Sequence, residues 1–179
     1  MKKIHTIGHS NLSLEDFISI LVTHDIRVLV DVRATPYSKR FPHFSEQILR
    51  AALQDKGIIY HWAGRQLGGR RETSNHSIHI ALPEDMRGFA DYMSTNEFER
   101  AAMQLVNMSD KTATAIMCAE KLPEHCHRSL IADYLLLKGI QVMHITSENP
   151  SYEHHLRPEA RRESASLIYD QASNMEMDF

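Results

Sequence analysis

One short segment of the chain concentrates groups that can do chemistry. Residues 118–128 contain two thiols, two imidazoles, two carboxylates and one guanidinium. The segment connects a strand-like apolar run, residues 113–117, to a helix-like run, residues 129–138. In a parallel α/β sheet, ligands bind outside the carboxyl ends of the strands. The segment therefore predicts an active site or an anion site; the plainer alternative is a polar loop with a helix cap.

The two cysteines can supply a nucleophile, because a thiol at a strand end or helix N-terminus can have a lowered pKa. Cys118 and Cys126 have neither the spacing of a CxxC redox motif nor the Cys-to-Arg spacing of a phosphatase loop. A zinc site built from both thiols with His125 and His127 has no standard spacing either. The sequence therefore indicates no metal site and names no cofactor. In a chain with two cysteines and no leader pattern, we expect both as free thiols.

The arginines predict a site for an anion. Arg128 lies near a predicted helix start, where free N–H groups and the helix dipole favour negative charge and a guanidinium adds a bidentate fork. Arg33 and Arg70 extend this positive field, together with Lys39, Arg40, Arg65 and Arg71. We expect a small anionic ligand or nucleotide to contact six residues: Ser10, Arg33, Arg70, Cys126, His127 and Arg128.

Apolar patterns predict the elements that position these groups. Mostly apolar runs predict five strands, at residues 3–7, 27–32, 58–61, 113–118 and 141–146. Helical periodicity predicts helices at residues 13–22, 45–56, 86–93, 97–108 and 126–138. This alternation predicts an α/β fold: a single three-layer domain with a largely parallel sheet of about five strands and helices on both faces.

Parallel strands share one carboxyl edge, so polar residues that follow different strands should meet there. Such residues follow the first, second and fourth predicted strands, and we expect a catalytic set among them: His9, Asp31, Cys118 and Glu120. Asp31 or Glu120 would be the general acid or base, and His9 would share that role. Cys118 would line the site or act as the nucleophile.

Composition sets the frame for the fold. The 179 residues are 42% hydrophobic and 24% charged, which is ordinary for a soluble globular protein. We expect residues 1–150 to form a single α/β domain and residues 151–179 a C-terminal extension. Weak periodicity predicts that the extension is partly helical, with an end that frays. Residues 65–82 have no regular pattern, which is typical of a functional or mobile connection.

Charge and hydropathy narrow the partners. The net charge of −3 argues against a generally basic nucleic-acid binder, but it leaves a local basic patch open. No apolar run approaches the roughly 18 residues of a membrane span, and no signal peptide is evident, so we expect no membrane partner and a cytoplasmic location. Oligomeric state is not indicated. Among the twelve histidines, His76, His79, His154 and His155 are expected on the surface.

Four motifs, taken in order, resemble one protein family. They are Thr6-Ile-Gly-His-Ser10; Asp31-Val-Arg33 with Pro36 and Ser38; Leu67-Gly-Gly69; and Cys118-x-Glu120 followed by Cys126-His-Arg128. The family is the bacterial family of domains of unknown function numbered 488, and the resemblance runs from about Ile4 to Ile145. It implies a small single-domain α/β protein of bacteria and archaea without an established activity, so it supports the fold and the site position but supplies no reaction.

Three functions remain open from the sequence. The leading hypothesis is an enzyme that acts on a phosphorylated small molecule or nucleotide by hydrolysis or group transfer. The first alternative is a nucleic-acid-processing or repair factor, which requires the basic residues 39–40 and 65–71 to form one track. The second alternative is a non-catalytic sensor of an anion or nucleotide, in which structural hydrogen bonds occupy Asp31 and Glu120.

Overall fold

A six-stranded sheet with the strand order β3-β2-β4-β1-β5-β6 forms the centre of the protein. The computed structural model describes residues 2–147 and 150–171. Strands β1 to β5 run parallel, whereas β6 pairs antiparallel with β5. The strands are β1 Lys3–Gly8, β2 Val28–Asp31, β3 Ile59–Trp62, β4 Thr114–Cys118, β5 Gln141–Ile145 and β6 Tyr152–Glu153. The five predicted strands are confirmed, and β6 is an addition at the edge.

The helices connect the parallel strands. They are α1 Leu14–Thr23, α2 Glu46–Gln54, α3 Gly64–Leu67, α4 Glu84–Tyr92, α5 Asn96–Ser109 and α6 Arg128–Leu137, with 3-10 turns η1 Pro42–Phe44 and η2 Pro123–His125. The Ser13 hydroxyl caps α1 by accepting a hydrogen bond from the Asp16 amide at 3.0 Å. The five predicted helices are confirmed. The additional short elements α3, η1 and η2 have at most one turn, which is too short to show a hydrophobic period.

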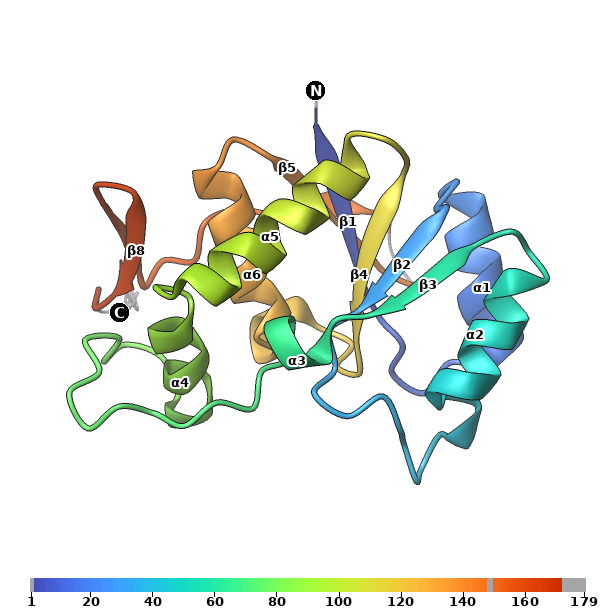
Figure 1. Cartoon of the computed structure of the whole chain (residues 1–179), viewed down its shortest axis with the longest axis horizontal. Helices are drawn as coiled ribbons and strands as arrows, with labels where there is room; N and C mark the ends of the chain where they lie inside the picture. Colours follow the sequence, from blue (N-terminus) through green and yellow to red (C-terminus); the bar gives the residue numbers. More distant parts are fainter. Residues whose placement is uncertain (1, 148–149, 172–179) are drawn as a thin grey trace, which may run out of the picture.

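Helices cover both faces of the sheet and produce three layers. In Figure 1, α1 and α2 lie on one side of the strands and α5 and α6 on the other. Side chains alternate along β4 accordingly: Ala115 and Met117 pack in the core under α1 and α2, whereas Ile116 and Cys118 pack toward α5 and α6. The predicted three-layer α/β fold is therefore confirmed.

The carboxyl ends of the strands lie at one edge of the sheet. Strand β1 starts beside the N-terminus at the top of Figure 1 and runs down toward α3. Strand β4 lies between β1 and β2, and its register pairs Gly8 with Cys118 and Asp31 with Met117. The His9 amide then donates to the Cys118 carbonyl at 3.0 Å. Residues that follow three different strands are thus fixed next to one another.

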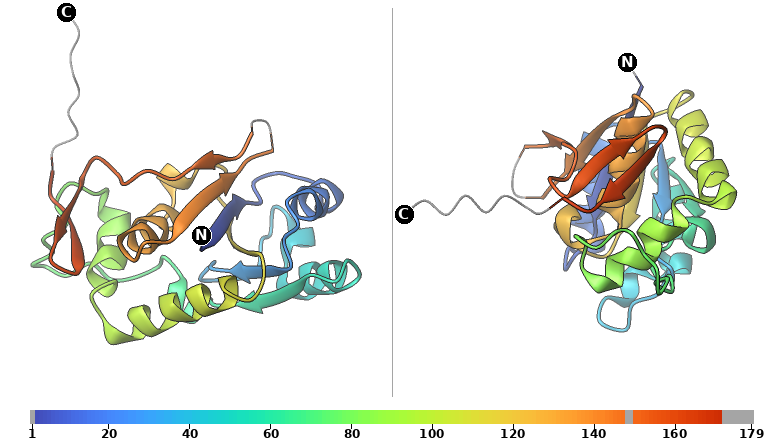
Figure 2. Two further views of the ribbon diagram at one scale, coloured as in Figure 1. Left: turned by 90° about the horizontal axis from the view of Figure 1, so that it is seen from above. Right: turned by 90° about the vertical axis from the view of Figure 1, so that its left-hand side faces the viewer.

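The tail forms a β-hairpin, so the predicted helical character of the extension is wrong. Strands β7, Ala160–Glu163, and β8, Ser166–Tyr169, pair in a separate two-stranded sheet. Figure 2 shows the hairpin on the side of the molecule away from α1 and α2. Leu167 and Tyr169 alternate along β8 and are buried in the main core. The buried side chains of β8 recur every second residue, which is the spacing of a strand and not of a helix. The predicted frayed end lies outside the described residues.

Two of the four histidines expected on the surface are buried. His154 is 7% exposed and His79 is 5% exposed, while His76 and His155 are exposed as predicted. Both buried rings belong to contacts made by the tail, which sequence reasoning did not place. None of the helices in the described part of the chain has the length and apolar character needed to cross a bilayer.

Candidate functional site

A cleft of about 890 Å³ opens at the carboxyl edge of the sheet. Ser10, Asp31 and Arg128 do not line it: Asp31 and Arg128 are buried next to it, and the Ser10 amide donates to the Ala119 carbonyl. The other seven predicted site residues do line it: His9, Arg33, Arg70, Cys118, Glu120, Cys126 and His127. The edge predicted from the parallel strands is therefore where the cleft lies.

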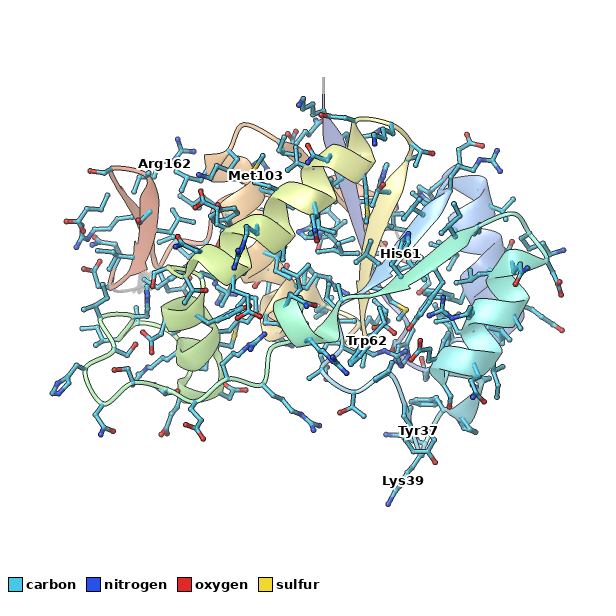
Figure 3. All side chains as sticks on the ribbon, viewed as in Figure 1. Tyr37, Lys39, His61, Trp62, Met103 and Arg162 are labelled. Carbon is cyan, nitrogen blue, oxygen red and sulfur yellow. The ribbon has the colours of Figure 1, made fainter. Side chains whose placement is uncertain are left out.

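Two loops and the start of α4 complete the walls of the cleft. Figure 3 shows Tyr37 and Lys39 on the loop that follows β2 and projects beyond the strand ends. Arg71, expected to extend the positive field, also lines the cleft. The lining residues that sequence reasoning did not assign to the site come mainly from these walls: Ala34, Thr35, Tyr37, Ser38, Gly69, Glu72, Asp85 and Met86, with Ala119 and His125 from the connection between β4 and α6. The patternless stretch at residues 65–82 was the available signal for part of this wall.

Four residues around the start of α6 form what we call the thiol cluster: Cys118, Cys126, His127 and Arg128. The Cys118 and Cys126 sulfurs lie 2.9 Å apart, and both cysteines are free. Arg128 Nη1 donates to Cys118 Sγ at 3.0 Å, and the Arg128 amide donates to Cys126 Sγ at 3.4 Å. His127 Nδ1 lies 3.5 Å from Cys126 Sγ, while its Nε2 bonds the Leu67 carbonyl at 2.9 Å. A guanidinium and a helix-start amide therefore both face the sulfur pair.

The burial of Arg128 implies that the sulfur pair carries a negative charge. Arg128 is 1% exposed. Its polar partners are Cys118 Sγ and the Lys121 carbonyl, and its Nε has none. No carboxylate of the described residues forms an ion pair with it. A buried cation without a counter-charge is costly. A thiolate shared within the pair would supply that counter-charge at 3.0 Å from Arg128 Nη1.

The environment favours Cys126 as the thiolate. The hydrogen bond with Cys118 lowers the pKa of Cys126 well below its usual value, and His127 and Arg128 lower it further. Burial raises the pKa of Cys118 well above its usual value. Arg128 Nη1 lies 3.0 Å from Cys118 Sγ, so its charge acts on the sulfur pair as a whole and on the proton between the two sulfurs.

Two motif glycines make room for the thiol cluster. A Cβ on Gly8 would lie 1.8 Å from the Glu120 carbonyl oxygen and 2.9 Å from Arg128 Nη1. A Cβ on Gly69 would lie 2.5 Å from His127 Nδ1. Both positions need glycine because no larger residue fits: Gly8 lies against the backbone of Glu120, and Gly69 lies against the ring of His127.

Asp31 is a buried anchor and not a free acid or base. Its carboxylate accepts bonds from Arg33 Nε at 2.9 Å, Arg33 Nη2 at 2.6 Å and the Tyr60 hydroxyl at 2.6 Å. Burial and the Asp31 charge raise the pKa of Tyr60, which stays a hydrogen-bond donor. Arg33 is thus held rigidly, and only its Nη1 is left to face His9 and the cleft.

His9 is neutral and orients the guanidinium of Arg33. Its ring stacks on Phe44 at a centroid distance of 4.2 Å, and burial lowers its pKa to about 4. Nδ1 bonds the Ser10 carbonyl at 2.9 Å, so Nδ1 carries the proton. Nε2 is left as an acceptor that faces Arg33 Nη1 at 3.4 Å. Over residues 2–147 and 150–171, no group of three or more Cys, His, Asp or Glu side chains is arranged to hold a metal ion.

Fold and cleft together define a class: single-domain parallel α/β proteins with polar and thiol groups gathered at the carboxyl edge of the sheet. Within it, the chain belongs to the family described as domain of unknown function DUF488, whose model matches residues 13–135. The predicted family is thereby confirmed, and the tail hairpin lies outside the match. Neither the comparison with curated proteins nor the comparison with solved structures found a match.

Proposed function

We propose that the protein is an enzyme that acts on a small phosphorylated molecule or nucleotide by group transfer, with Cys126 as the nucleophile. The observation that carries the proposal is the buried Arg128, whose charge favours a thiolate beside it, next to a cleft lined by both cysteines. A thiolate, unlike a thiol, is an effective nucleophile. This assignment exchanges the two cysteines relative to the sequence-based hypothesis, which gave Cys118 the catalytic role.

The lining of the cleft supports a substrate with mixed polarity. Arg33 and Arg70 can bind an anionic group, and Arg70 has no partner among the described residues. The carboxylates Glu72, Asp85 and Glu120 can accept hydrogen bonds from hydroxyl or amino groups. The volume of about 890 Å³ lies in the range of about 300–1,000 Å³ typical of small-molecule sites. Such mixed lining does not make the continuous basic track that a nucleic-acid-processing role requires.

The reaction needs one nucleophile and one proton carrier. Cys126 Sγ forms a bond to the electrophilic phosphorus or carbon next to the anionic group, and the bond to the leaving group breaks. Glu120, exposed in the cleft lining, gives a proton to the leaving group. An acceptor or water then displaces the sulfur, gives its proton to Glu120, and the Cys126 thiolate is restored. The free thiol pair suits a reducing compartment, and we propose a cytoplasmic location.

The test is a panel of phosphate esters and nucleotides, assayed for turnover and, after acid quench, for a covalent adduct by intact mass. We expect turnover and an adduct at Cys126 in the wild type, and neither in Cys126→Ser. Cys118→Ser is the matched control and should retain adduct formation, because it keeps Cys126 and Arg128 and its hydroxyl can still donate a hydrogen bond to Cys126 Sγ. A panel without turnover, adduct or protection of Cys126 against iodoacetamide would overturn the proposal.

A non-catalytic anion sensor is the second candidate. The observation in its favour is the saturation of Asp31 by Arg33 and Tyr60, which removes one expected acid or base from the chemistry. The same panel separates the two candidates. A nucleotide that protects Cys126 from iodoacetamide without turnover, and binds equally well to Cys126→Ser, identifies a sensor.

A further inference from the structure

The sulfur pair has the geometry of a dithiol that can be oxidised. Cys118 Sγ and Cys126 Sγ lie 2.9 Å apart, and a disulfide bond is roughly 2.0 Å long. Both residues line the cleft, and Cys126 keeps 7% of its surface exposed, so a solute as small as a peroxide has a route to the pair. Two cysteines used only for packing would be surrounded by apolar atoms, whereas these two face a guanidinium and a helix-start amide.

We propose that Cys118 and Cys126 form a peroxide-reactive dithiol, which closes to an intramolecular disulfide and so withdraws the nucleophile from the cleft. The co-reactant is a hydroperoxide. The oxidation stands on the sulfur geometry and the cleft alone; only the loss of the nucleophile rests on the group-transfer reaction proposed above.

The chemistry balances in two steps. The Cys126 thiolate attacks hydrogen peroxide; an S–O bond forms, the O–O bond breaks, and hydroxide leaves, so that sulfur is oxidised to a sulfenic acid and the peroxide is reduced. Cys118 Sγ then attacks Cys126 Sγ; the S–S bond forms, the S–OH bond breaks, and the Cys118 proton leaves with the hydroxyl group as water. Overall, the thiolate, the thiol and one peroxide yield a disulfide, one water and one hydroxide.

The roles of the two thiols follow from their surroundings. Cys126 is 7% exposed and Cys118 is 2% exposed, so the peroxide meets Cys126 first. Cys118 lies behind it, held at contact distance by Arg128, and is placed to resolve the sulfenic acid. Disulfide closure also removes the anion that balances Arg128. The reduced state is therefore the one that the protein stabilises, and ordinary thiols should reopen the disulfide readily.

The first test uses the reduced full-length protein and hydrogen peroxide. Samples are denatured, alkylated and weighed by intact mass spectrometry, and peptides are mapped. We expect two alkylated thiols before treatment, and none afterwards, with an internal Cys118–Cys126 link that dithiothreitol reverses. Two free thiols after treatment, a link between two chains, or oxidation to sulfinic acid without a link would overturn the proposal.

The second test assigns the roles with dimedone, which traps sulfenic acids. Cys118→Ser should accumulate the adduct on Cys126, because the resolving thiol is gone, whereas Cys126→Ser should leave Cys118 unreacted. Equal reactivity of Cys126→Ser and wild type would overturn the assignment. Thermal melts check that the variants fold. If Cys118→Ser does not fold, the wild-type time course decides: a transient adduct on Cys126 before the disulfide supports the order, and one on Cys118 refutes it. Loss of turnover on the substrate panel affects none of these readouts.

Discussion

Helix α6 carries two buried polar clusters that differ in how completely their polar atoms are hydrogen-bonded. The thiol cluster lies at its start, and a second group, which we call the Asp133 network, lies one turn further on. In the Asp133 network, Asp133 Oδ1 accepts from His154 Nε2 at 2.9 Å and from the Arg157 amide at 3.1 Å, and Oδ2 accepts from the Tyr169 hydroxyl at 3.0 Å. His154 Nδ1 bonds His144 Nε2 at 2.8 Å, and His144 Nδ1 bonds the Thr6 hydroxyl at 2.7 Å.

The difference separates a structural cluster from a reactive one. Every ring nitrogen of His144 and His154 and both carboxylate oxygens of Asp133 have a protein partner, so none of these atoms is left to bind or attack a ligand, although a cavity of about 410 Å³ adjoins them. In the thiol cluster, Arg128 has no carboxylate partner in the described ranges and Nε has no hydrogen bond. Saturated polar groups hold a fold together, whereas an unsaturated charge next to a cleft leaves a thiolate available for chemistry.

The largest effect is expected from Asp133→Ala. It leaves His154, the Arg157 amide and the Tyr169 hydroxyl without their acceptor. Breaking a buried network in this way costs about 3–5 kcal/mol of unfolding free energy, measured by denaturant titration. The pKa of Cys126, from the pH dependence of iodoacetamide alkylation of the folded protein, should not change. A large shift of that pKa would show that the two clusters are coupled and would break the comparison.

The next effect concerns the charge at Arg128. Arg128→Met removes the cation but fills much of the space, so the pKa of Cys126 should rise by roughly 1–3 units. The alkylation rate at neutral pH should fall accordingly. Arg128→Lys is the matched variant, because it keeps the positive charge, and it should retain most of the low pKa. Identical pH–rate profiles for wild type and Arg128→Met would mean that the sulfur pair carries no charge that depends on Arg128.

A smaller effect is expected from Gly69→Ala. The new Cβ would lie 2.5 Å from His127 Nδ1, and the displaced ring would lose its bond to the Leu67 carbonyl. Such overpacking costs about 1–3 kcal/mol, measured by denaturant titration. A double-mutant cycle provides the control: in a His127→Ala background the ring is absent and the cost should largely disappear. An equal cost in both backgrounds would exclude the contact as its cause.

The smallest effect per pH unit is expected from two buried histidines: His9 in the cleft lining and His144 in the Asp133 network. Burial lowers the pKa of His9 to about 4, and burial together with the charges of His154 and Arg128 lowers the pKa of His144 to about 3. Between pH 6.5 and about 4, these histidines bind protons in the unfolded chain but not in the folded protein. The unfolding free energy therefore falls as the pH falls through this range, and it does not depend on these histidines above pH 6.5. Each histidine contributes about 1.4 kcal/mol per pH unit. His9→Gln and His144→Gln should each make the slope of unfolding free energy against pH shallower by that amount; an unchanged slope would contradict a neutral buried ring.

The position of the site was predictable because the alternation of strands and helices in the sequence already indicates that the strands are parallel. Strands buried on both faces appear in the sequence as continuous apolar runs. If these strands are parallel, His9 and Cys118 lie at the same edge of the sheet whatever the order of the strands in it. How deeply each site residue is buried was not predictable. Arg128 follows Cys126 by two residues, yet Cys126 lines the cleft and Arg128 lies outside its lining, because Cys126 has extended backbone before the helix whereas Arg128 is the first residue of α6.

The Asp133 network was missed, although one signal was present. An aspartate in the middle of the apolar run 130–137 requires buried partners. Those partners come from residues 144–169, and their pairing depends on a hairpin whose two-residue alternation is too short to stand out against helical periodicity. Local pattern therefore predicted the domain but not how the tail attaches to it.

The position of β4 between β1 and β2 also constrains how the protein is made. As the chain leaves the ribosome, β1, β2 and β3 are synthesised before β4, which fills the gap between β1 and β2, and 82 residues separate Asp31 at the end of β2 from Thr114 at the start of β4. Pairing across such a separation is slow, because loop-closure entropy is lost before the contacts form. The nascent chain therefore has no cleft until β4 has paired with β1 and β2. The contacts that lower the pKa of Cys126 also form only then, when the start of α6 folds beside β4.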